Sequence, residues 1–217
     1  MKTTFADFAA CTVCITLLLG AALLTACGLS IANPYHVILD VAVFLLAYGA
    51  YSALLLALLR MARPYPEGTW SMDTPQFAYW KLASVLTNLA DKAWSPFNTV
   101  FTQGLIYSLL GARVGNQPAF GGTVRDLPLL DFGDHCTIGQ DSVITAHAIT
   151  HDRITFARVR IGKNAVVGIN CVVMPGVELG EGAVLAPGAV ATVGTRIPPH
   201  ELWGGIPASK LKDLPQG

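Results

Sequence analysis

Two of the five histidines in this 217-residue chain stand four residues apart, in the stretch "ITAHAITHDRI". An imidazole titrates near neutral pH, so His147 or His151 could take a proton from a hydroxyl or amine and return it to a leaving group. Histidines also bind metals, but a catalytic zinc site needs three protein ligands. The pair offers two, and no histidine lies between Asp152 and Pro199. These residue types indicate proton transfer, with zinc binding as an alternative.

The pair lies where a six-residue repeat breaks. The hexads read FGDHCT, IGQDSV, ITAHAI and, after the break, IGKNAV, VGINCV, VMPGVE, LGEGAV, LAPGAV and ATVGTR. The first position is always apolar, and the fifth is always small or β-branched. This period fits neither a helix nor an alternating strand, but it is typical of a triangular solenoid in which short strands are joined by turns. Cys136 and Cys171 are then small core residues at the fifth position.

The hexad frame also predicts how the residues at the break are directed. Ile144 and Ala148 are expected to point into the solenoid, which leaves His147 at an outward turn position. Residues 150 to 160 are expected to leave the repeat as a loop. Because a flat solenoid face forms no pocket, we expect chemistry in this loop or in a groove between subunits.

The start of the chain is apolar enough for a membrane. Charged residues make up 13% of the chain, against about a quarter in soluble proteins. Residues 8–32 carry no charge and residues 37–59 carry only Asp40, and each run is longer than the roughly 20 residues that cross a bilayer as a helix. Basic residues flank the pair of runs but do not separate them. This pattern predicts a transmembrane hairpin with both ends in the cytoplasm.

A lipoprotein signal is the alternative for the first apolar run, because residues 24–27 read LTAC, like a lipoprotein cleavage box. That interpretation would place the rest of the chain outside the cytoplasm. The hairpin is favoured because Asp7 offsets Lys2 in a weak n-region and because a second long apolar run follows at once.

Residues 63–112 mix aromatic and polar residues at helical spacing. Pro75 opens one predicted helix, and Pro96 opens a second that Gly111 ends. Such amphipathic, Trp-rich helices could lie along the bilayer interface or pack against the following domain.

The hexads and the tail "WGGIPASKL" resemble the bacterial hexapeptide-repeat acyltransferases. The order of two spans, an aromatic region, "PFNTVFTQGLIYSLLGARVG" and hexads resembles the membrane-bound terminal units of polylysine-synthetase-like nonribosomal peptide synthetases. The expected fold is mainly β: a left-handed parallel β-helix of about four coils in residues 113–217. A transmembrane helical hairpin in residues 1–62 and amphipathic interfacial helices in residues 63–112 precede it.

The resemblance implies roles for the residues at the break. In similar proteins the general base is a histidine 15 residues after the first apolar residue of a coil and 14 before the next "IG". His147 stands at these distances from Phe132 and Ile161. His151 is the second candidate for the base or an orienting group, and Asp152 is the candidate that would orient His147.

The resemblance also implies acyl-CoA, with acetyl-CoA as the expected form, as a co-substrate that binds between the solenoids of a homotrimer, without a resident cofactor or metal. The residues that match the family's tail are Trp203, Gly204, Gly205, Pro207 and Ala208. Lys210 could meet the CoA phosphates as a point charge. Pro187 and Ser209 depart from the family's pattern, in which many relatives have a backbone donor and a basic residue.

These observations predict an acyltransferase anchored in the bacterial inner membrane, with its catalytic domain on the cytoplasmic side. The expected acceptor is a hydroxyl or amine of a small molecule, saccharide or peptide, and membrane lipid is a further partner. Equal numbers of acidic and basic residues, 14 each, give no surface for nucleic acid. A noncatalytic trimeric membrane scaffold is one rival, which would be indifferent to His147. A zinc enzyme similar to the β-helix carbonic anhydrases, which bind zinc between subunits, is another.

Overall fold

The chain forms two compact units in a computed structural model that describes residues 3–31 and 35–215. The helical unit comprises Met1–Tyr65 and Met72–Asn98, and the second unit comprises Pro66–Ser71 and Thr99–Gly217. The predicted middle segment of residues 63–112 is therefore divided between the two units. The short segment 66–71 joins the second unit although both of its neighbours in sequence belong to the first.

Two long apolar helices open the helical unit, α1 (Phe5–Leu29) and α2 (His36–Ala62). The hydroxyls of Thr25 and Tyr51 lie 2.8 Å apart, and Ser30 donates to Asp40 at 3.0 Å. These contacts show that the two helices run antiparallel. Both are long and apolar enough to cross a membrane, judged by length and composition, so the two predicted helices are present and their insertion stays a prediction.

The third helix, α3 (Pro75–Trp94), begins at the predicted proline, with Thr74 as its N-cap. The indole N–H of Trp94 donates to the carbonyl of Leu46 at 3.2 Å. Gly49 makes room for this ring, because a Cβ at that position would lie 2.2 Å from Trp94 Nε1. The end of α3 therefore packs into a notch in the middle of α2.

The start of α3 contacts the outer ends of the two long helices. The rings of Tyr65 and Tyr79 meet edge to face, with centroids 5.9 Å apart. Lys81 forms an ion pair with Asp7, and its ammonium lies 4.8 Å from the centroid of the Phe77 ring. Burial raises the pKa of the Tyr79 hydroxyl, as expected for a phenol held in a packed helical unit.

The second predicted helix is shorter than expected. Its first residues form a 3-10 turn, η1 (Ser95–Phe97), and α4 (Gln103–Leu109) begins only after an irregular stretch. In that stretch the hydroxyl of Thr102 accepts the amide N–H of Thr99 at 2.8 Å. Local bonds from threonine side chains compete with helical ones, and β-branched residues disfavour a helix. The prediction of one helix from Pro96 to Gly111 is therefore wrong.

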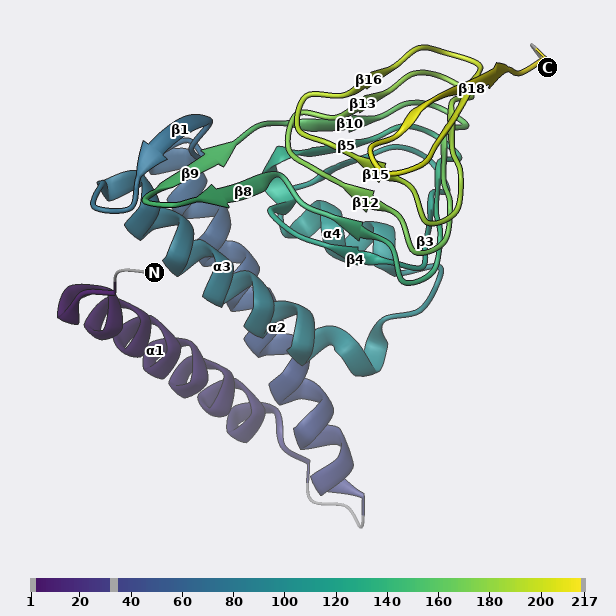
Figure 1. Cartoon of the computed structure of the whole chain (residues 1–217). Helices are drawn as coiled ribbons and strands as arrows, with labels where there is room; N and C mark the ends of the chain where they lie inside the picture. Colours follow the sequence, from purple (N-terminus) through teal and green to yellow (C-terminus); the bar gives the residue numbers. More distant parts are fainter. Residues whose placement is uncertain (1–2, 32–34, 216–217) are drawn as a thin grey trace. The chain divides into compact units, whose positions relative to one another are not determined.

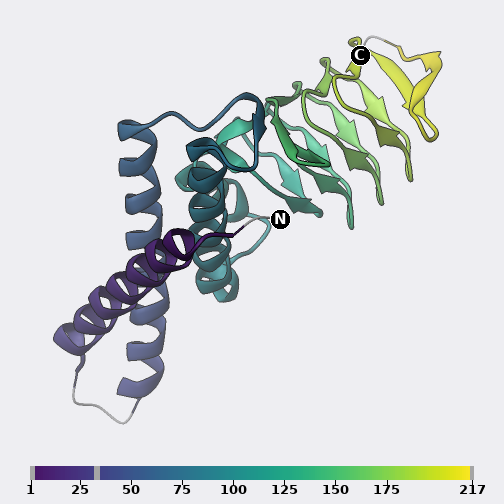
Figure 2. The same ribbon diagram turned by 60° about the vertical axis from the view of Figure 1, so that its left-hand side comes forward.

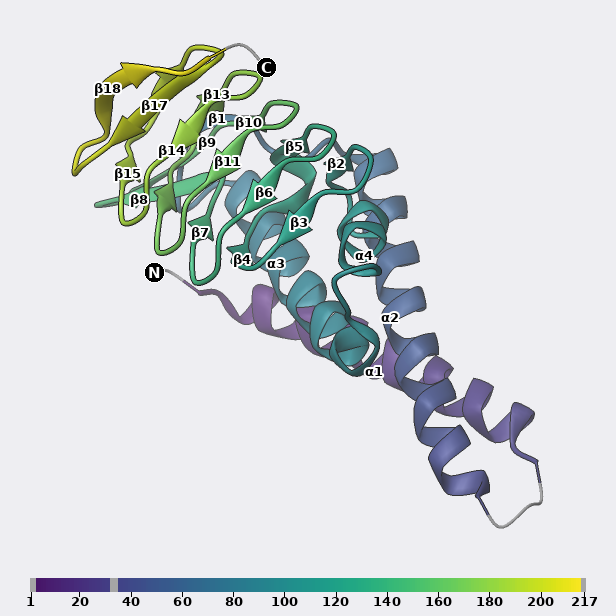
Figure 3. The same cartoon turned by 90° about the vertical axis from the view of Figure 1, so that its right-hand side faces the viewer.

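The second unit is a parallel β-helix, in which successive short strands belong to successive sheets (Figures 1 and 2). The first sheet contains β2 (Arg113–Val114), β5 (Leu130–Phe132), β10 (Val159–Ile161), β13 (Glu178–Leu179) and β16 (Arg196–Ile197). The second, which Figure 3 shows in order, contains β3 (Ala119–Phe120), β6 (Thr137–Ile138), β11 (Val166–Val167), β14 (Val184–Leu185), β17 (Glu201–Gly204) and the antiparallel β18 (Ser209–Asp213). The third contains β4 (Thr123–Val124), β7 (Val143–Ile144), β12 (Val172–Val173) and β15 (Val190–Ala191).

The predicted hexad core is confirmed over most of the repeat. Paired residues such as Val166 and Val184 lie 18 positions apart, which is three hexads. The fully buried fifth positions are Cys136, Ser142, Ala165, Cys171, Val177, Ala183 and Ala189. The fourth residue of a hexad has a positive φ, 55° at both His135 and Asn164. This conformation favours Asn and Gly, which explains their recurrence there.

The hexad pattern ends earlier than the sequence frame predicts. Ala146 is fully buried and Ala148 is not. From His147 the chain instead forms the antiparallel strands β8 (His147–Thr150) and β9 (Arg153–Phe156). The amide of Ala157 donates to the carbonyl of Ala146 at 3.0 Å, where the chain rejoins the solenoid. The predictions that Ala148 points inward and that residues 150 to 160 form a loop are wrong, because the insertion is a β-hairpin.

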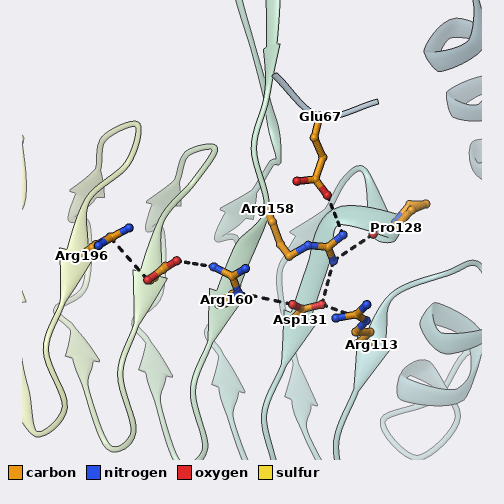
Figure 4. A network of polar contacts seen from close by, with 8 residues as sticks. Glu67, Arg113, Pro128, Asp131, Arg158, Arg160 and Arg196 are labelled. Carbon is orange, nitrogen blue, oxygen red and sulfur yellow. Dashed lines mark hydrogen bonds and ion pairs between the residues drawn. The ribbon is translucent and has the colours of Figure 1, made fainter. Parts of the chain in front are cut away.

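A column of alternating charges follows the outer face of the first sheet (Figure 4). Its members, in register from strand to strand, are Arg113, Asp131, Arg160, Glu178 and Arg196. Each carboxylate lies between two guanidiniums, with N–O distances of 3.8 Å at Asp131 and 3.7 Å between Arg196 and Glu178. Opposite charges on adjacent strands favour this register, but exposed pairs of this kind add little to stability.

Candidate active site

His147 lies at the root of the β8–β9 hairpin, where the chain leaves the solenoid. Its side chain is 21% exposed, and its Nδ1 lies 2.5 Å from Oδ2 of Asp126. The Asp126 side chain is only 2% exposed. Because an ionised carboxylate only accepts hydrogen bonds, we assign the imidazole proton to Nδ1. The other nitrogen, Nε2, is then left as a proton acceptor.

Asp126 is fixed by the backbone of the neighbouring turn of the solenoid. Val124 pairs with Ile144, which places Asp126 beside the residues that precede the hairpin. Its Oδ2 accepts the amide N–H of Ala146 at 3.2 Å and the hydroxyl of Thr145 at 3.3 Å. Asp126 itself has φ 61° and ψ 46°, a left-handed conformation that aspartate tolerates better than most residues. It begins the short 3-10 turn η2 (Leu127–Leu129).

Thr145 completes this polar cluster. Its hydroxyl lies 3.1 Å from Nδ1 of His147 and 3.2 Å from the carbonyl oxygen of the same residue. A hydroxyl donates one hydrogen bond at a time, so with the proton on Nδ1 it donates either to the carbonyl oxygen of His147 or to Asp126. The cluster holds the imidazole in one orientation while leaving part of the ring exposed.

The other two residues proposed for the break lie at the tip of the hairpin. His151 and Asp152 form the two-residue turn between β8 and β9, and both are exposed. His151 has a φ of 53°. The carboxylate that contacts His147 is Asp126, a residue that sequence reasoning missed.

The first coil of the solenoid is two residues longer than the hexad period, which is why the sequence did not reveal Asp126. Strand pairs there are separated by 18 residues at Ala119 and Thr137 but by 20 at Val124 and Ile144. Counting 18 residues back from His147 leads to an apolar leucine rather than to Asp126. The signal that could have revealed the slip is the turn sequence "RDLP", in which an aspartate precedes a proline-containing turn.

The predicted acyl-CoA residues gather in the β17–β18 hairpin. The amide of Ala208 donates to the carbonyl of Val190 at 2.8 Å, and the amide of Val190 donates to the carbonyl of Gly205 at 3.0 Å. The loop that contains Pro207 thus continues the third sheet. Gly204 lies in a closely packed place, because a Cβ there would lie 2.9 Å from Cδ1 of Leu211 and 3.1 Å from the Cβ of Ala186.

The charge of Lys210 is already partly compensated. Its ammonium lies 2.7 Å from Glu201 and 2.8 Å from Asp213. Hydrogen bonds to Asp213 and Glu201 raise the pKa of Lys210, and those from Lys210 and Trp203 lower the pKa of Glu201. The indole N–H of Trp203 donates to Glu201 at 2.7 Å. A CoA phosphate would therefore compete with two carboxylates for Lys210.

A hollow of ≈ 710 Å³ lies elsewhere, along the charged column of the first sheet. Arg113, Arg160 and Arg196 line it, together with Asp131 and Glu178. Its guanidiniums are paired with carboxylates of the same column, and neither His147 nor Asp126 lines it. The contact between those two residues, rather than this hollow, therefore marks the candidate active site.

Comparisons with known proteins place the repeat in a family. Residues 158–192 match the family "Bacterial transferase hexapeptide (six repeats)". YvoF of Bacillus subtilis, provisionally named an acetyltransferase, is 30% identical over 107 residues, which are 48% of this chain and 61% of YvoF. Gamma carbonic anhydrase 2 of Arabidopsis thaliana, a mitochondrial protein, is 33% identical over 88 residues, which are 41% of this chain and 27% of that protein.

A solved structure agrees with the fold. A hexapeptide-repeat-containing acetyltransferase from Vibrio cholerae superposes with a TM-score of 0.53 at 16% identity, covering 69% of this chain and 97% of the other. The chain therefore carries the hexapeptide repeat of this bacterial transferase family over residues 158–192, where the hexads predict it. It spans about 61% of the length of YvoF and about 27% of the anhydrase.

Proposed function

We propose that this chain is a membrane-anchored acyltransferase that moves an acyl group, with acetyl as the first candidate, from acyl-CoA to a hydroxyl or amine. The observation that carries the proposal is the contact between His147 and the buried Asp126 at the break in the repeat. The match to a transferase family and the acetyltransferase name of YvoF support the same reaction class.

The chemistry follows from the assigned tautomer. Nε2 of His147 takes the proton of the acceptor O–H or N–H as the acceptor attacks the thioester carbonyl. The new bond to the acyl carbon forms, the carbon–sulfur bond breaks, and the imidazolium returns the proton to the leaving thiolate. Asp126 stabilises the imidazolium through Nδ1–H without accepting the proton itself.

The remaining features of the proposal follow from the resemblance and, for the membrane anchor, from the two apolar runs and the basic residues that flank them. The β-helix is left-handed with about four coils, and three copies form the active assembly. Acyl-CoA binds along the tail that contains Trp203, Gly204, Gly205, Pro207, Ala208 and Lys210. The helices α1 and α2 anchor the protein in the lipid of the bacterial inner membrane, with the β-helix in the cytoplasm, where acyl-CoA is made. The acceptor is a small molecule, a saccharide or a peptide.

A carbonic-anhydrase-like zinc enzyme is a second candidate, favoured by the 33% identity to the Arabidopsis protein over 88 residues. Within residues 3–31 and 35–215 no group of three or more histidine, cysteine or acidic side chains could hold a metal in one copy. A zinc site would therefore need ligands from more than one subunit, with His147 or His151 among them.

The experiment that tests the proposal uses the purified full-length protein in detergent. Release of free CoA from acetyl-CoA is measured with a panel of amines, alcohols and saccharides, and the acylated products are identified by mass spectrometry. We expect acceptor-dependent CoA release. Stoichiometric zinc with CO₂ hydration and no acyl transfer would favour the anhydrase. Absence of both activities from an intact trimer would favour the noncatalytic scaffold.

A further inference from the structure

The sheet that carries His147 is completed by a strand from a distant part of the sequence. β1 (Gly68–Ser71) pairs antiparallel with β9, and β9 pairs antiparallel with β8 (Figure 1). Phe156 lies opposite His147 on one side and opposite Gly68 on the other. The hydroxyls of Thr69 and Thr155 are 2.9 Å apart. We call the segment Pro66–Ser71 the strap.

The strap is joined to the solenoid by one guanidinium (Figure 4). Arg158 follows β9, is 19% exposed at its side chain, and donates through Nη2 to Glu67 of the strap at 2.9 Å. Its Nη1 donates to Asp131 at 3.1 Å and approaches the carbonyl of Pro128 at 3.4 Å. Since a planar guanidinium has donors fixed in a fork, it can hold these acceptors together.

Two acceptors of Arg158 belong to the segment that bears Asp126, and the third, Glu67, belongs to the strap that pairs with the hairpin of His147. Pro128 and Asp131 lie just after Asp126, in and beyond η2. Arg158 itself directly follows the insertion that begins with His147, between β9 and β10. Arg158 therefore fixes the segment that bears the carboxylate relative to the hairpin that bears the imidazole.

A hairpin of two short strands needs such support. Isolated two-stranded hairpins are marginally stable in water, and a third strand is usually required. The strap supplies that strand, although the chain before and after it belongs to the helical unit.

We propose that the strap and Arg158 are positioning elements of the active site, which hold His147 at the distance from Asp126 that proton transfer needs. This inference rests on the proposed function, but its structural part concerns only the order of the hairpin. Glu67, which is half exposed, contributes through Arg158 and does not touch the reacting groups.

The test uses Arg158→Ala, Arg158→Lys and Glu67→Gln in the full-length chain. Glu181→Gln is the matched control, because Glu181 and Lys163 form an exposed ion pair, 4.0 Å apart, on the same solenoid. Amide hydrogen exchange of residues 147–156 reports the order of the hairpin. Trypsin cleavage after Arg153, near the hairpin tip, reports its opening independently.

We expect exchange and cleavage in this hairpin to accelerate about tenfold or more in Arg158→Ala, because a hydrogen-bonded charged group is lost and local opening becomes easier. Glu67→Gln should act in the same direction but less, Arg158→Lys should restore part of the protection, and Glu181→Gln should change nothing. In acetyl-transfer assays kcat should fall about tenfold in Arg158→Ala, while KM for acetyl-CoA stays within about twofold because the tail is untouched.

Three outcomes are decisive. Unchanged exchange of residues 147–156 in Arg158→Ala overturns the inference. A loosened hairpin with unchanged kcat overturns the positioning role. A wild-type protein that transfers no acyl group contradicts the proposed function and the catalytic part of this inference, whereas hydrogen exchange still decides whether the strap orders the hairpin.

Discussion

Replacing Asp126 with asparagine removes one negative charge from the candidate active site and little else. The left-handed backbone at this position, with φ 61°, is one that asparagine tolerates. Asparagine keeps an acceptor oxygen for the amide of Ala146, which donates at 3.2 Å. The fold should therefore survive, and the thermal midpoint should stay close to that of the wild type.

The expected loss follows from the 2.5 Å contact with Nδ1 of His147. A hydrogen bond to a charged group contributes about 1.5–3 kcal/mol, and a neutral one about 0.5–1.5 kcal/mol. Losing the negative charge of Asp126 should raise the activation barrier of acyl transfer by about 1–1.5 kcal/mol, which lowers kcat roughly five- to fifteenfold. If the asparagine amide donates to Nδ1, the imidazole proton moves to Nε2, which can then no longer accept a proton, and kcat falls further.

The assay is steady-state acetyl transfer with CoA release as the readout. Asp141→Asn is the matched control, because Asp141 is an exposed hexad-turn aspartate with φ 58°. The prediction is a lower kcat for Asp126→Asn with an unchanged KM for acetyl-CoA. Equal kcat values for the two variants would refute the orienting role of Asp126.

Three further predictions test the core, its thiols and the topology. Ala183→Leu forces extra atoms into a fully buried wall and should lower stability by about 1–3 kcal/mol; an unchanged denaturant midpoint would contradict the hexad register. Burial raises the pKa of Cys136 from 9.0 to about 11. The rate of its alkylation at pH 8 should therefore be about a hundredfold lower than that of an unshifted thiol, and this rate should rise with pH. Rapid labelling of Cys136, mapped by mass spectrometry, would place this residue outside the core. Tags at either terminus should be reached by a membrane-impermeant reagent only after the inner membrane is permeabilised; an exposed C-terminal tag would revive the lipoprotein interpretation.

The sequence predicts the solenoid well because each hexad position meets the same surroundings in every turn. A first-position residue such as Val167 is buried wherever the period holds, so the repeat itself reveals the core. The prediction loses accuracy after Ala146. The fourth position of that hexad is His147, which lies in strand β8 and does not take the positive φ of the other fourth positions.

The parts of the site that were not predicted depend on irregular or long-range contacts. Asp126 reaches His147 through a two-residue slip of the first turn. The hairpin left a local trace in the apolar Ile149, Ile154 and Phe156, but a short insertion of this kind also fits a loop. The strap pairs with residues more than 80 positions away, and a four-residue strand such as "GTWS" has too little pattern to predict a partner.

The central claim is tested most directly by acetyl transfer with His147→Ala across the pH range. If His147 is the general base, kcat should fall by roughly a hundredfold or more, the acetyl-CoA KM should change little, and trimer assembly should persist. His151→Ala should lower kcat only a few-fold, and His135→Asn, at an exposed turn with φ 55°, should behave as the wild type. Full activity of His147→Ala would contradict the general-base assignment and favour the noncatalytic scaffold.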